Sequence, residues 1–256
     1  MKLDGNTILI TGGGSGIGAA LAHRFHDLGN TVVVAGRRLD VLEATIKGRA
    51  NMAAMQLDVE DPASIAAFTR RLVAEHPGLN VLINNAGIMR FETPDRARDL
   101  ADAEATITAN LLGPIRMIDG LIDHLATRDG AAIVNVTSGL AFVPLVTTPT
   151  YNATKAALHS YTVALREALR DKVEVIELVP PAVQTELTPG QSDRPGYMPL
   201  GAFVDEVMEL FSRQPTPPEI LVERVGFLRR AEAEGRFAET LEQLNAFAHA
   251  ARKAGN

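Results

Sequence analysis

Residues 6–38 read NTILITGGGSGIGAALAHRFHDLGNTVVVAGRR, and this segment predicts the first three elements of the fold. A β-branched run from Thr7 to Thr11 predicts a strand, the glycines after it predict a turn, and an amphipathic pattern to about Leu28 predicts a helix. A second strand is expected from Thr31 to Ala35. Strand, helix and strand in this order form a βαβ unit, in which two parallel strands lie in one sheet and the helix covers one face.

The glycines Gly12, Gly16 and Gly18 have the spacing G-x-x-x-G-x-G. Glycine at these positions permits a tight turn, close approach of a pyrophosphate and close packing of the helix on the sheet. The N-terminus of the helix also offers free N–H groups to phosphates. We therefore expect a dinucleotide site here, with a glycine-rich turn that binds no ligand as the alternative.

The residues after the second strand bear on which dinucleotide binds. A carboxylate there would bind the ribose hydroxyls and repel a 2′-phosphate, but the strand is followed by Gly36, Arg37 and Arg38. Two guanidiniums can pair with a phosphate, so NADP(H) is preferred over NAD(H), unless both arginines are only solvated charges at the start of a helix. Asp58, after the third expected strand, either accepts a hydrogen bond from adenine or caps the helix near Pro62.

Strand and helix patterns alternate along the chain without a linker, an internal repeat or a low-complexity run. Residues 1–256 are therefore expected to form one α/β domain, with a single doubly wound parallel sheet of the Rossmann type and helices on both faces. Further strands are expected near residues 52–57, 81–84, 132–136, 173–179 and 220–222.

Composition excludes several classes of function. The 256 residues are 46% apolar and include no cysteine, which excludes disulfides, thiolate catalysis and thiolate metal sites. The six histidines form no close motif with acidic residues, so no metal site is expected. A net charge of −6 gives no general attraction to nucleic acid or acidic membranes, and no targeting or spanning segment is evident. We expect a cytoplasmic protein whose partner is a small molecule.

Six short motifs follow one another along the chain. TGGGSGIG is followed by NNAG at 84–87, NLLG at 110–113, NVTS ending at Ser138, YNATK at 151–155 and PPAVQT at 180–185. With these motifs the sequence resembles the short-chain dehydrogenase/reductase family from Leu3 to about Thr185, and within it the bacterial oxidoreductases associated with the D-alanylation operon. The resemblance implies a parallel sheet whose active site lies beyond the carboxyl ends of the strands.

Tyr151 and Lys155 are four residues apart in an expected helix and so share one of its faces. A Lys155 ammonium stabilises a tyrosinate, as does a positively charged nicotinamide ring, so we expect the pKa of the Tyr151 phenol to be lowered. The resemblance implies that Tyr151 protonates a carbonyl oxygen or deprotonates an alcohol, that Ser138 orients the same oxygen, and that Lys155 also holds the nicotinamide ribose.

The resemblance further implies that the backbone carbonyl of Asn110 positions a water in a proton relay to Lys155. Taken singly, each member of this group also has an ordinary alternative role. Ser138 can be a turn residue at a strand end, Asn110 a polar group inside a helix, and Tyr151 with Lys155 the exposed start of a helix.

The cofactor-binding residues expected from the motifs and the resemblance lie in the glycine turn, at the strand ends and in the loop after the sixth strand. They are Gly12, Ser15, Gly16, Ile17, Gly18, Arg37, Arg38, Asp58, Val59, Asn85, Ala86, Gly87, Tyr151, Lys155, Pro181, Val183 and Thr185. The family commonly has Pro-Gly where this chain has Pro180 and Pro181. A second proline removes a backbone N–H and fixes φ, so this loop is expected to take a different path.

The sequence after Thr185 bears on the substrate. Residues 186–217 are rich in turn formers and are expected to form a substrate lid that carries a helix, and residues 223–252 an amphipathic helical tail. An apolar pocket is expected from loop residues, several of which have packing of the lid onto the body as their alternative role: Met89, Phe91, Leu140, Phe142, Val143, Leu145, Tyr197, Met198 and Phe203. The helix from Tyr151 resembles the subunit-pairing helix of the family, which implies a homodimer or homotetramer.

These features predict an NADP(H)-dependent carbonyl reductase or alcohol dehydrogenase that acts on a medium-sized, largely apolar substrate. Two alternatives remain open. One is a dinucleotide-binding sensor or scaffold without turnover, against which the intact Ser138, Tyr151 and Lys155 argue. The other is a different reaction on the same fold, such as epimerisation, dehydration or dehalogenation.

Overall fold

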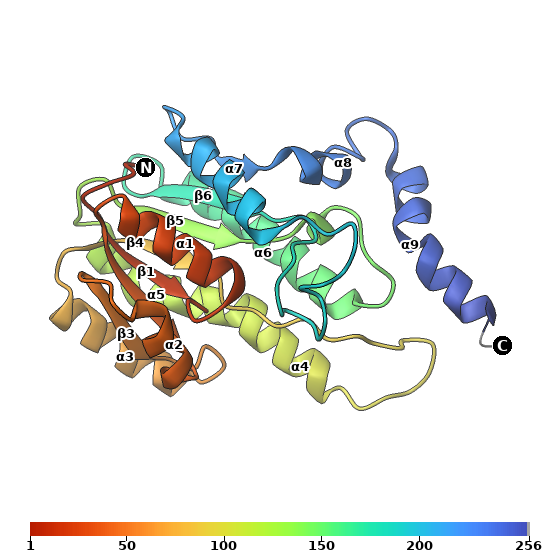
Figure 1. Ribbon diagram of the computed structural model, residues 1–256, viewed down its shortest axis with the longest axis horizontal. Coiled ribbons are helices and arrows are strands. Elements are labelled where there is room, and N and C mark those ends of the chain that lie inside the picture. The colour runs from red at the N-terminus through yellow and green to blue at the C-terminus, as the bar shows by residue number, and fades with distance from the viewer. Residues whose placement is uncertain (255–256) are drawn as a thin grey trace.

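Seven parallel strands form one sheet in the order β3-β2-β1-β4-β5-β6-β7 (Figure 1). This computed structural model describes the backbone of residues 1–254 and the side chains of residues 1–246. The strands are β1 (Thr7–Thr11), β2 (Thr31–Gly36), β3 (Met52–Gln56), β4 (Leu79–Asn84), β5 (Ala132–Val136), β6 (Glu174–Val179) and β7 (Glu219–Leu221).

Helices cover both faces of this sheet (Figure 1). Short 3-10 helices are found at Gly139–Ala141 (η2) and Glu223–Val225 (η3), and a π-helix at Thr108–Leu112 (η1). The α-helices are α1 (Gly16–Asp27), α2 (Leu39–Ile46), α3 (Pro62–Glu75), α4 (Ala101–Ile107), α5 (Gly113–Leu125), α6 (Pro149–Ala168), α7 (Leu200–Ser212), α8 (Gly226–Arg229) and α9 (Phe237–Ala254).

Successive residues of the central strands point to opposite faces of the sheet. Ile8 and Ile10 belong to the core shared with α1 and α7, whereas Leu9 between them belongs to the core shared with α3 and α5. Burial on both faces explains why β1 and β2 read as continuous apolar runs rather than as an alternation of apolar and polar residues.

The expected fold class is confirmed, and the strands lie within two residues of their expected bounds. β4 begins at Leu79 rather than at Val81, because Leu79 already pairs with Thr7 across an irregularity in the register. In the sheet β1 lies between β2 and β4, so the order of the chain reverses at this point. Ligands of doubly wound folds bind in the crevice beyond the carboxyl ends of the strands at this switch point.

The helix near Pro62 is capped by Asp61, and the capping role considered for Asp58 is wrong. The Asp61 carboxylate accepts a hydrogen bond from the backbone N–H of Ala63 at 2.8 Å. Asp61 directly precedes Pro62 and has the extended backbone that an N-cap residue needs. The Asp58 carboxylate instead accepts from the backbone N–H of Glu60 at 2.9 Å.

The second half of the expected lid is part of the body of the protein. One face of α7 is buried in the core, and its Phe211 packs edge-on against Phe25 of α1, with 5.8 Å between the ring centres. The helix carried by the expected lid, 186–217, is therefore part of the body, because its apolar face covers the sheet, and a lid formed by the loop before α7 stays a prediction.

The helical tail is fastened beside the site through one buried side chain. Asn245 of α9 donates to the carbonyl oxygen of Pro144 at 3.0 Å and accepts from the backbone N–H of Val146 at 2.7 Å. It thereby holds the loop between β5 and α6, although the rest of α9 extends away from the sheet (Figure 1). The side chains of residues 247–252 of the expected tail lie outside the described residues.

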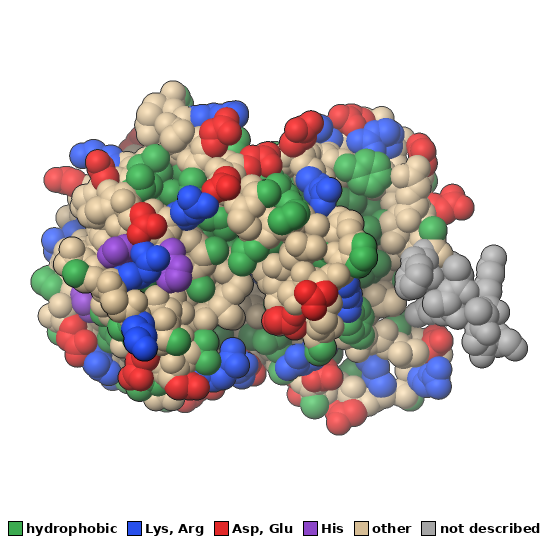
Figure 2. Space-filling model, viewed as in Figure 1, with side chains coloured by type: hydrophobic (Ala, Val, Ile, Leu, Met, Phe, Trp, Pro, Cys, Tyr) green, Lys and Arg blue, Asp and Glu red, His purple; other side chains and the backbone are tan. Residues whose placement is uncertain are grey.

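The charged side chains are mixed over the face of the molecule shown in Figure 2, where acidic and basic groups lie side by side. Within the part of the chain that the structure describes, no helix combines the length and apolar character that crossing a membrane requires.

Candidate active site

The glycine turn after β1 lies against the end of β4 without room for side chains. Gly12 has a φ of +66°, and a Cβ there would lie 2.9 Å from the Cα of Ala86. A Cβ on Gly18 would lie 2.4 Å from the carbonyl oxygen of Gly12, so α1 can pack this closely only with glycine. The Asn85 side chain donates to the carbonyl oxygens of Thr11 at 3.0 Å and Gly12 at 3.2 Å. The turn therefore packs against the backbone of Ala86 and is hydrogen-bonded to the side chain of Asn85.

A cavity of about 390 Å³ extends from this turn along the ends of the central strands. Of the expected cofactor residues, Gly18 and Asp58 do not line it, since Gly18 lies against Gly12 and Asp58 faces the backbone of Glu60. The others do: Gly12, Ser15, Gly16, Ile17, Arg37, Arg38, Val59, Asn85, Ala86, Gly87, Tyr151, Lys155, Pro181, Val183 and Thr185.

Arg37 and Arg38 line one end of the cavity, just beyond β2. The Arg37 guanidinium, which is 58% exposed, pairs with the Glu60 carboxylate at 3.0 Å. Glu60 also lines the cavity, and the sequence analysis missed it because it follows β3 rather than β2. The acidic run after β3 could have indicated this residue. Because β3 pairs in parallel with β2, the residues after β3 lie beside the arginines that follow β2.

Tyr151 lies in the first turn of α6 at the edge of the cavity. The Glu92 carboxylate accepts hydrogen bonds from the backbone N–H of Thr150 at 2.9 Å and from its hydroxyl at 2.7 Å, and so stabilises the N-terminus of this helix. Burial raises the pKa of Tyr151 to about 12, while its hydrogen bond with Ser138 acts to lower it. The expected lowering of this pKa is therefore wrong for this structure, because desolvation of the phenol outweighs its neighbours.

Lys155 lies one helical turn beyond Tyr151 and is also buried. Its ammonium donates a hydrogen bond to the carbonyl oxygen of Val136, at the end of β5, at 2.8 Å. The nitrogen lies 5.7 Å from the centre of the Tyr151 ring. Desolvation lowers the pKa of Lys155 to about 8, which brings this group close to neutral pH, as is common for groups that take part in proton transfer.

Asn110 is fully buried and does not line the cavity. Its side chain accepts from the backbone N–H of Ile88 and donates to the Ile88 carbonyl oxygen, both at 2.8 Å. Two such bonds fix the loop after β4. Asn110 lies within the π-helix η1, a rare form of turn that is found frequently at functional sites. The role that the resemblance gives to its backbone carbonyl stays a prediction.

The substrate end of the cavity differs from the expected apolar pocket, because none of the nine expected residues lines it. Phe203 and Val143 are fully buried in the core, and Phe142 packs edge-on against His159. The side chains found there are mixed in character and were missed because they come from two loops whose approach the sequence does not show: Ile88, Arg90, Glu186, Leu187 and Gln191.

The loop that begins with Pro180 and Pro181 still reaches the cavity. The Pro180 carbonyl oxygen accepts from the backbone N–H of Gly139 at 2.9 Å, which holds the loop next to Ser138. Val183 forms a bridge with Met198, so the chain after it is held against the segment that precedes α7. Pro181 itself lines the cavity together with Val183.

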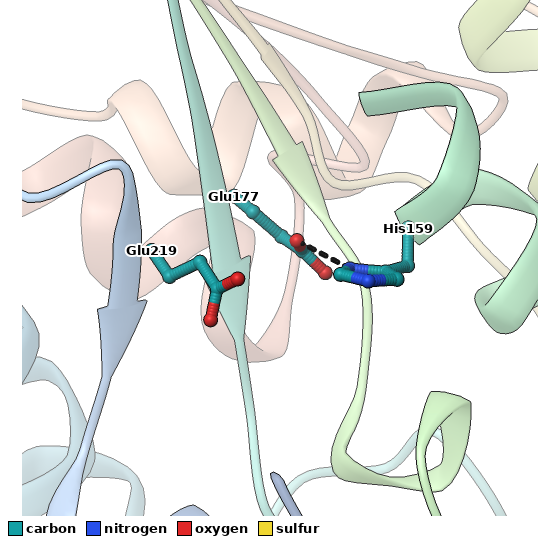
Figure 3. A group of neighbouring side chains, drawn as sticks. All are labelled: His159, Glu177 and Glu219. Atoms are coloured by element: carbon teal, nitrogen blue, oxygen red, sulfur yellow. Dashed lines mark hydrogen bonds and ion pairs between the residues drawn. The ribbon is translucent and has the colours of Figure 1, made fainter. Parts of the chain in front are cut away.

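One histidine has acidic partners that the sequence analysis did not foresee. His159, Glu177 and Glu219 come from α6, β6 and β7, and their nearest ligand atoms all lie within 4.8 Å of one another (Figure 3). These side chains are far apart along the chain, which is why no motif indicated them. The Glu219 carboxylate accepts two hydrogen bonds of 2.8 Å from the Arg229 guanidinium. The positive charge next to Glu219 is therefore supplied by this arginine.

Comparisons with known proteins agree with this geometry. The sequence model of the short chain dehydrogenase family matches residues 6–195. The chain is 40% identical over 249 residues to the uncharacterized oxidoreductase DltE of Bacillus subtilis (strain 168), which covers 96% of this chain and 98% of that protein. The expected likeness to the bacterial D-alanylation-operon oxidoreductases is thereby confirmed.

Two further proteins are similar over most of the chain. The NADP-dependent 3-hydroxy acid dehydrogenase of Schizosaccharomyces pombe is 32% identical over 194 residues, covering 73% of this chain and 75% of that protein. A solved short chain dehydrogenase from Burkholderia cenocepacia J2315 in complex with NADP is 26% identical, with a TM-score of 0.81, and the match covers 93% of this chain and 97% of that chain.

Lys155→Met is expected to raise the free energy of unfolding at about pH 7, although it removes a candidate catalytic group. Burial lowers the pKa of Lys155 from 10.5 to about 8, which corresponds to about 3 kcal/mol against the charged form. The lost hydrogen bond to Val136 costs about 1 kcal/mol. The unfolded chain holds the extra proton between pH 8 and 10.5, so the gain is greatest below about pH 8 and shrinks toward pH 10.5.

Urea unfolding of both proteins at pH values below and above 8 measures this difference, with Lys172→Met as the control at an exposed position. A Lys155→Met variant that is less stable than the wild type at every pH would contradict the account.

Proposed function

The chain belongs to the short chain dehydrogenase family, and we propose that it is an NADP(H)-dependent oxidoreductase that interconverts a carbonyl and an alcohol by hydride transfer. One observation carries this proposal. Ser138, Tyr151 and Lys155 all line the same edge of the cavity, where the Ser138 side chain acts on the phenol by lowering its pKa and the Lys155 ammonium donates to the carbonyl oxygen of Val136. The glycine turn at the other side of this cavity fits a pyrophosphate.

The residues present along the cavity fit such a dinucleotide. The glycine turn brings backbone rather than side chains to the cavity, and the N-terminus of α1 after Ser15 offers N–H donors to phosphate oxygens. Arg37 and Arg38 supply positive charge at the end of β2. Lys155, at the edge of the cavity that Tyr151 also lines, would hold the nicotinamide ribose.

Tyr151 is the proton donor and acceptor in this proposal. Because its pKa is about 12, the phenol stays protonated at neutral pH, which suits donation to a carbonyl oxygen during reduction. The Ser138 hydroxyl orients the same oxygen, and the Lys155 ammonium lies near enough to stabilise the tyrosinate that remains. The bound cofactor supplies the hydride, and the positive charge of its oxidised ring favours the tyrosinate that alcohol oxidation requires.

The preference for NADP(H) rests on Arg37 and Arg38, with Glu60 as an opposing influence. The 2′-phosphate of NADP(H) can pair with a guanidinium. In this structure the Glu60 carboxylate is paired with the Arg37 guanidinium. The same carboxylate would repel a phosphate bound next to Arg37. The balance between these two side chains is therefore the determinant of cofactor choice in this proposal.

The proposed substrate is a medium-sized, largely apolar ketone, aldehyde or secondary alcohol, for which Ile88 and Leu187 provide apolar contacts. A second candidate is a carbonyl compound that also carries a carboxylate. Arg90 lines the substrate end of the cavity and favours this class. The similar yeast protein is named a 3-hydroxy acid dehydrogenase, which agrees with the second candidate.

We also propose that the chain assembles as a homodimer or homotetramer through the exposed face of α6. Val163 of α6 is 41% exposed, and the adjoining α4 and η1 expose Ile107 and Leu112. Apolar side chains that lie together on a surface are typical of subunit interfaces. The mixed charges on the face in Figure 2 and the net charge of −6 support a small-molecule substrate rather than a nucleic acid or membrane partner.

Tyr151→Phe is expected to lower kcat by roughly a hundredfold to ten-thousandfold, because it removes the group that transfers the proton. The affinity for NADPH should change little, since the variant keeps the ring and loses only the hydroxyl. NADPH consumption measures turnover, and cofactor fluorescence measures binding. Tyr161→Phe, on the same helix, is the control and should keep wild-type turnover. A Tyr151→Phe enzyme with near-normal kcat would refute the assignment.

Arg37→Ala is expected to weaken NADPH binding by about 1–3 kcal/mol, the range of a charge-assisted contact, and to leave NADH binding nearly unchanged. Glu60→Gln should have the opposite effect on NADPH, because it frees the guanidinium and removes a negative charge. Calorimetric titration of the three proteins with both cofactors provides the comparison. An equal loss of NADPH and NADH affinity in Arg37→Ala would show that the residue has a structural role.

Arg90→Gln separates the two substrate classes. If a substrate carboxylate binds here, the variant should raise KM for a 3-oxo acid by roughly tenfold to a hundredfold, corresponding to about 1.5–3 kcal/mol, and leave KM for a neutral ketone unchanged. Arg96→Gln removes an exposed arginine outside the cavity and serves as the control. Equal effects of Arg90→Gln on both substrates would exclude the carboxylate class.

A further inference from the structure

Three successive residues at the end of β5 and just beyond it connect the candidate catalytic group to Glu177. The carbonyl oxygen of Val136 accepts a hydrogen bond from the ammonium of Lys155, and the side chain of Ser138 lies at the same edge of the cavity as Tyr151 and acts to lower its pKa. Thr137, between them, also lines the cavity. Its hydroxyl donates to an oxygen of Glu177 at 2.6 Å. The segment therefore contacts both α6, through Lys155, and β6, through Glu177.

Glu177 lies in β6, and its side chain is 0% exposed. One carboxylate oxygen accepts from Thr137, and the other accepts from Nδ1 of His159 at 2.8 Å (Figure 3). Because a carboxylate offers only acceptors, the Nδ1 atom of His159 carries a hydrogen. Both bonds involve a buried charge and are therefore of the stronger, charge-assisted kind.

The second partner of Glu177 lies on the helix that carries the catalytic candidates. His159 follows Lys155 by one turn of α6 and Tyr151 by two, so all three side chains point from the same side of this helix. Glu177 therefore connects the chain segment that carries Ser138 to the helix that carries Tyr151 and Lys155. A buried carboxylate without such partners would strongly lower the free energy of unfolding. Loss of either contact is therefore unfavourable.

The neighbouring Glu219 has a different role. It binds Arg229 of α8 through both carboxylate oxygens, and the guanidinium also lies over the ring of Phe142, 4.5 Å from its centre. A metal ion placed among His159, Glu177 and Glu219 would have to displace this guanidinium from Glu219 and the Nδ1–H of His159 from Glu177. The cluster is better explained as two separate contacts, Glu219 with Arg229 and Glu177 with His159 and Thr137, of which only that of Glu177 reaches residues 136–138.

We propose that Glu177 is a positioning residue, which through Thr137 and His159 sets the distance between the hydroxyls of Ser138 and Tyr151. This inference rests on the proposed function, because it assigns Glu177 to the same hydride-transfer site. Glu177 does not line the cavity and so has no part in binding cofactor or substrate.

Thr137→Val tests the proposal, since it keeps the shape of the side chain and removes the hydroxyl that Glu177 holds. We expect kcat to fall roughly tenfold to a hundredfold, as displacement of a catalytic group by about 1 Å does, while KM and the NADPH dissociation constant stay within about threefold. Thr137→Ser restores the hydroxyl and should recover most of kcat. Glu219→Gln is the matched control in the same cluster and should keep the wild-type kcat.

Glu177→Gln and the NMR signals of the tyrosines provide a second variant and a second measurement. If Thr137→Val does not fold, Glu177→Gln replaces it, because the neutral amide weakens both bonds without changing size. The 13Cζ NMR signals of the tyrosines report the contact without turnover, since the chain has only three tyrosines and no tryptophan. Tyr151→Phe assigns the signal of Tyr151, which Thr137→Val should shift and which Thr137→Ser and Glu219→Gln should not.

The outcomes separate the two proposals. A wild-type protein without turnover would count against the proposed function alone, and the Tyr151 signal would then decide whether Glu177 positions the two hydroxyls. A Thr137→Val variant with normal kcat or an unshifted Tyr151 signal would overturn the positioning role. So would an equal fall of kcat in Glu219→Gln, because the effect would then reflect general loss of stability.

Discussion

Thr11, at the end of β1, holds the turn on which the rest of the site depends. Its hydroxyl accepts hydrogen bonds from the backbone N–H groups of Asn85 and Ala86, both at 3.1 Å, while the Asn85 side chain donates back to the carbonyl oxygens of Thr11 and Gly12. These contacts join two parallel strands at the point where the order of the sheet reverses. The glycine turn is thereby kept open toward the cavity, because Gly12, Gly14 and Gly16 line it without side chains.

Burial of Lys155 in the candidate catalytic group costs stability at neutral pH, whereas burial of the Tyr151 phenol, which is neutral there in the folded and the unfolded chain, carries no such cost. Burial raises the pKa of Tyr151 and lowers that of Lys155, so each side chain is held in an environment that disfavours its charged form. Fixed contacts to residues 136–138 hold both side chains in place despite this cost. Groups held with such perturbed pKa values are typical of sites that move protons. The same segment also links the site to Glu177, whose carboxylate reaches no part of the cavity.

Much of the fold was predictable, because its signals are local. The β-branched runs, the glycine spacing and the alternation of strands with helices each depend on neighbouring residues, and they gave the sheet and the position of Ser138, Tyr151 and Lys155 at its edge. Local signals also misled. The turn-rich loop before residues 200–212 indicates a lid that includes this helix, but the apolar face of the helix covers the sheet. The pKa of Tyr151 depends on burial, which a four-residue spacing does not reveal.

Contacts between distant segments were not predictable. Glu60 reaches Arg37 only through the pairing of β2 with β3, and Arg90 and Leu187 meet only where two loops converge. The partners of Glu177 lie 40 residues before it and 18 residues before it in the chain. We propose that these residues act in cofactor choice, in substrate class or in positioning. Thr137 lies in the motif NVTS, which gives no sign of its contact with Glu177, and the others lie outside the six motifs.

Transfer of deuterium from the cofactor to a substrate shows whether this protein catalyses hydride transfer. The wild-type protein is incubated with NADPH deuterated at both C4 positions and with a panel of apolar ketones, aldehydes and 3-oxo acids, and the alcohols formed are analysed by mass spectrometry. We expect at least one alcohol that carries one deuterium at the former carbonyl carbon. Tight binding of NADPH without a deuterated alcohol from any member of the panel would contradict the proposed function and favour a dinucleotide-binding sensor.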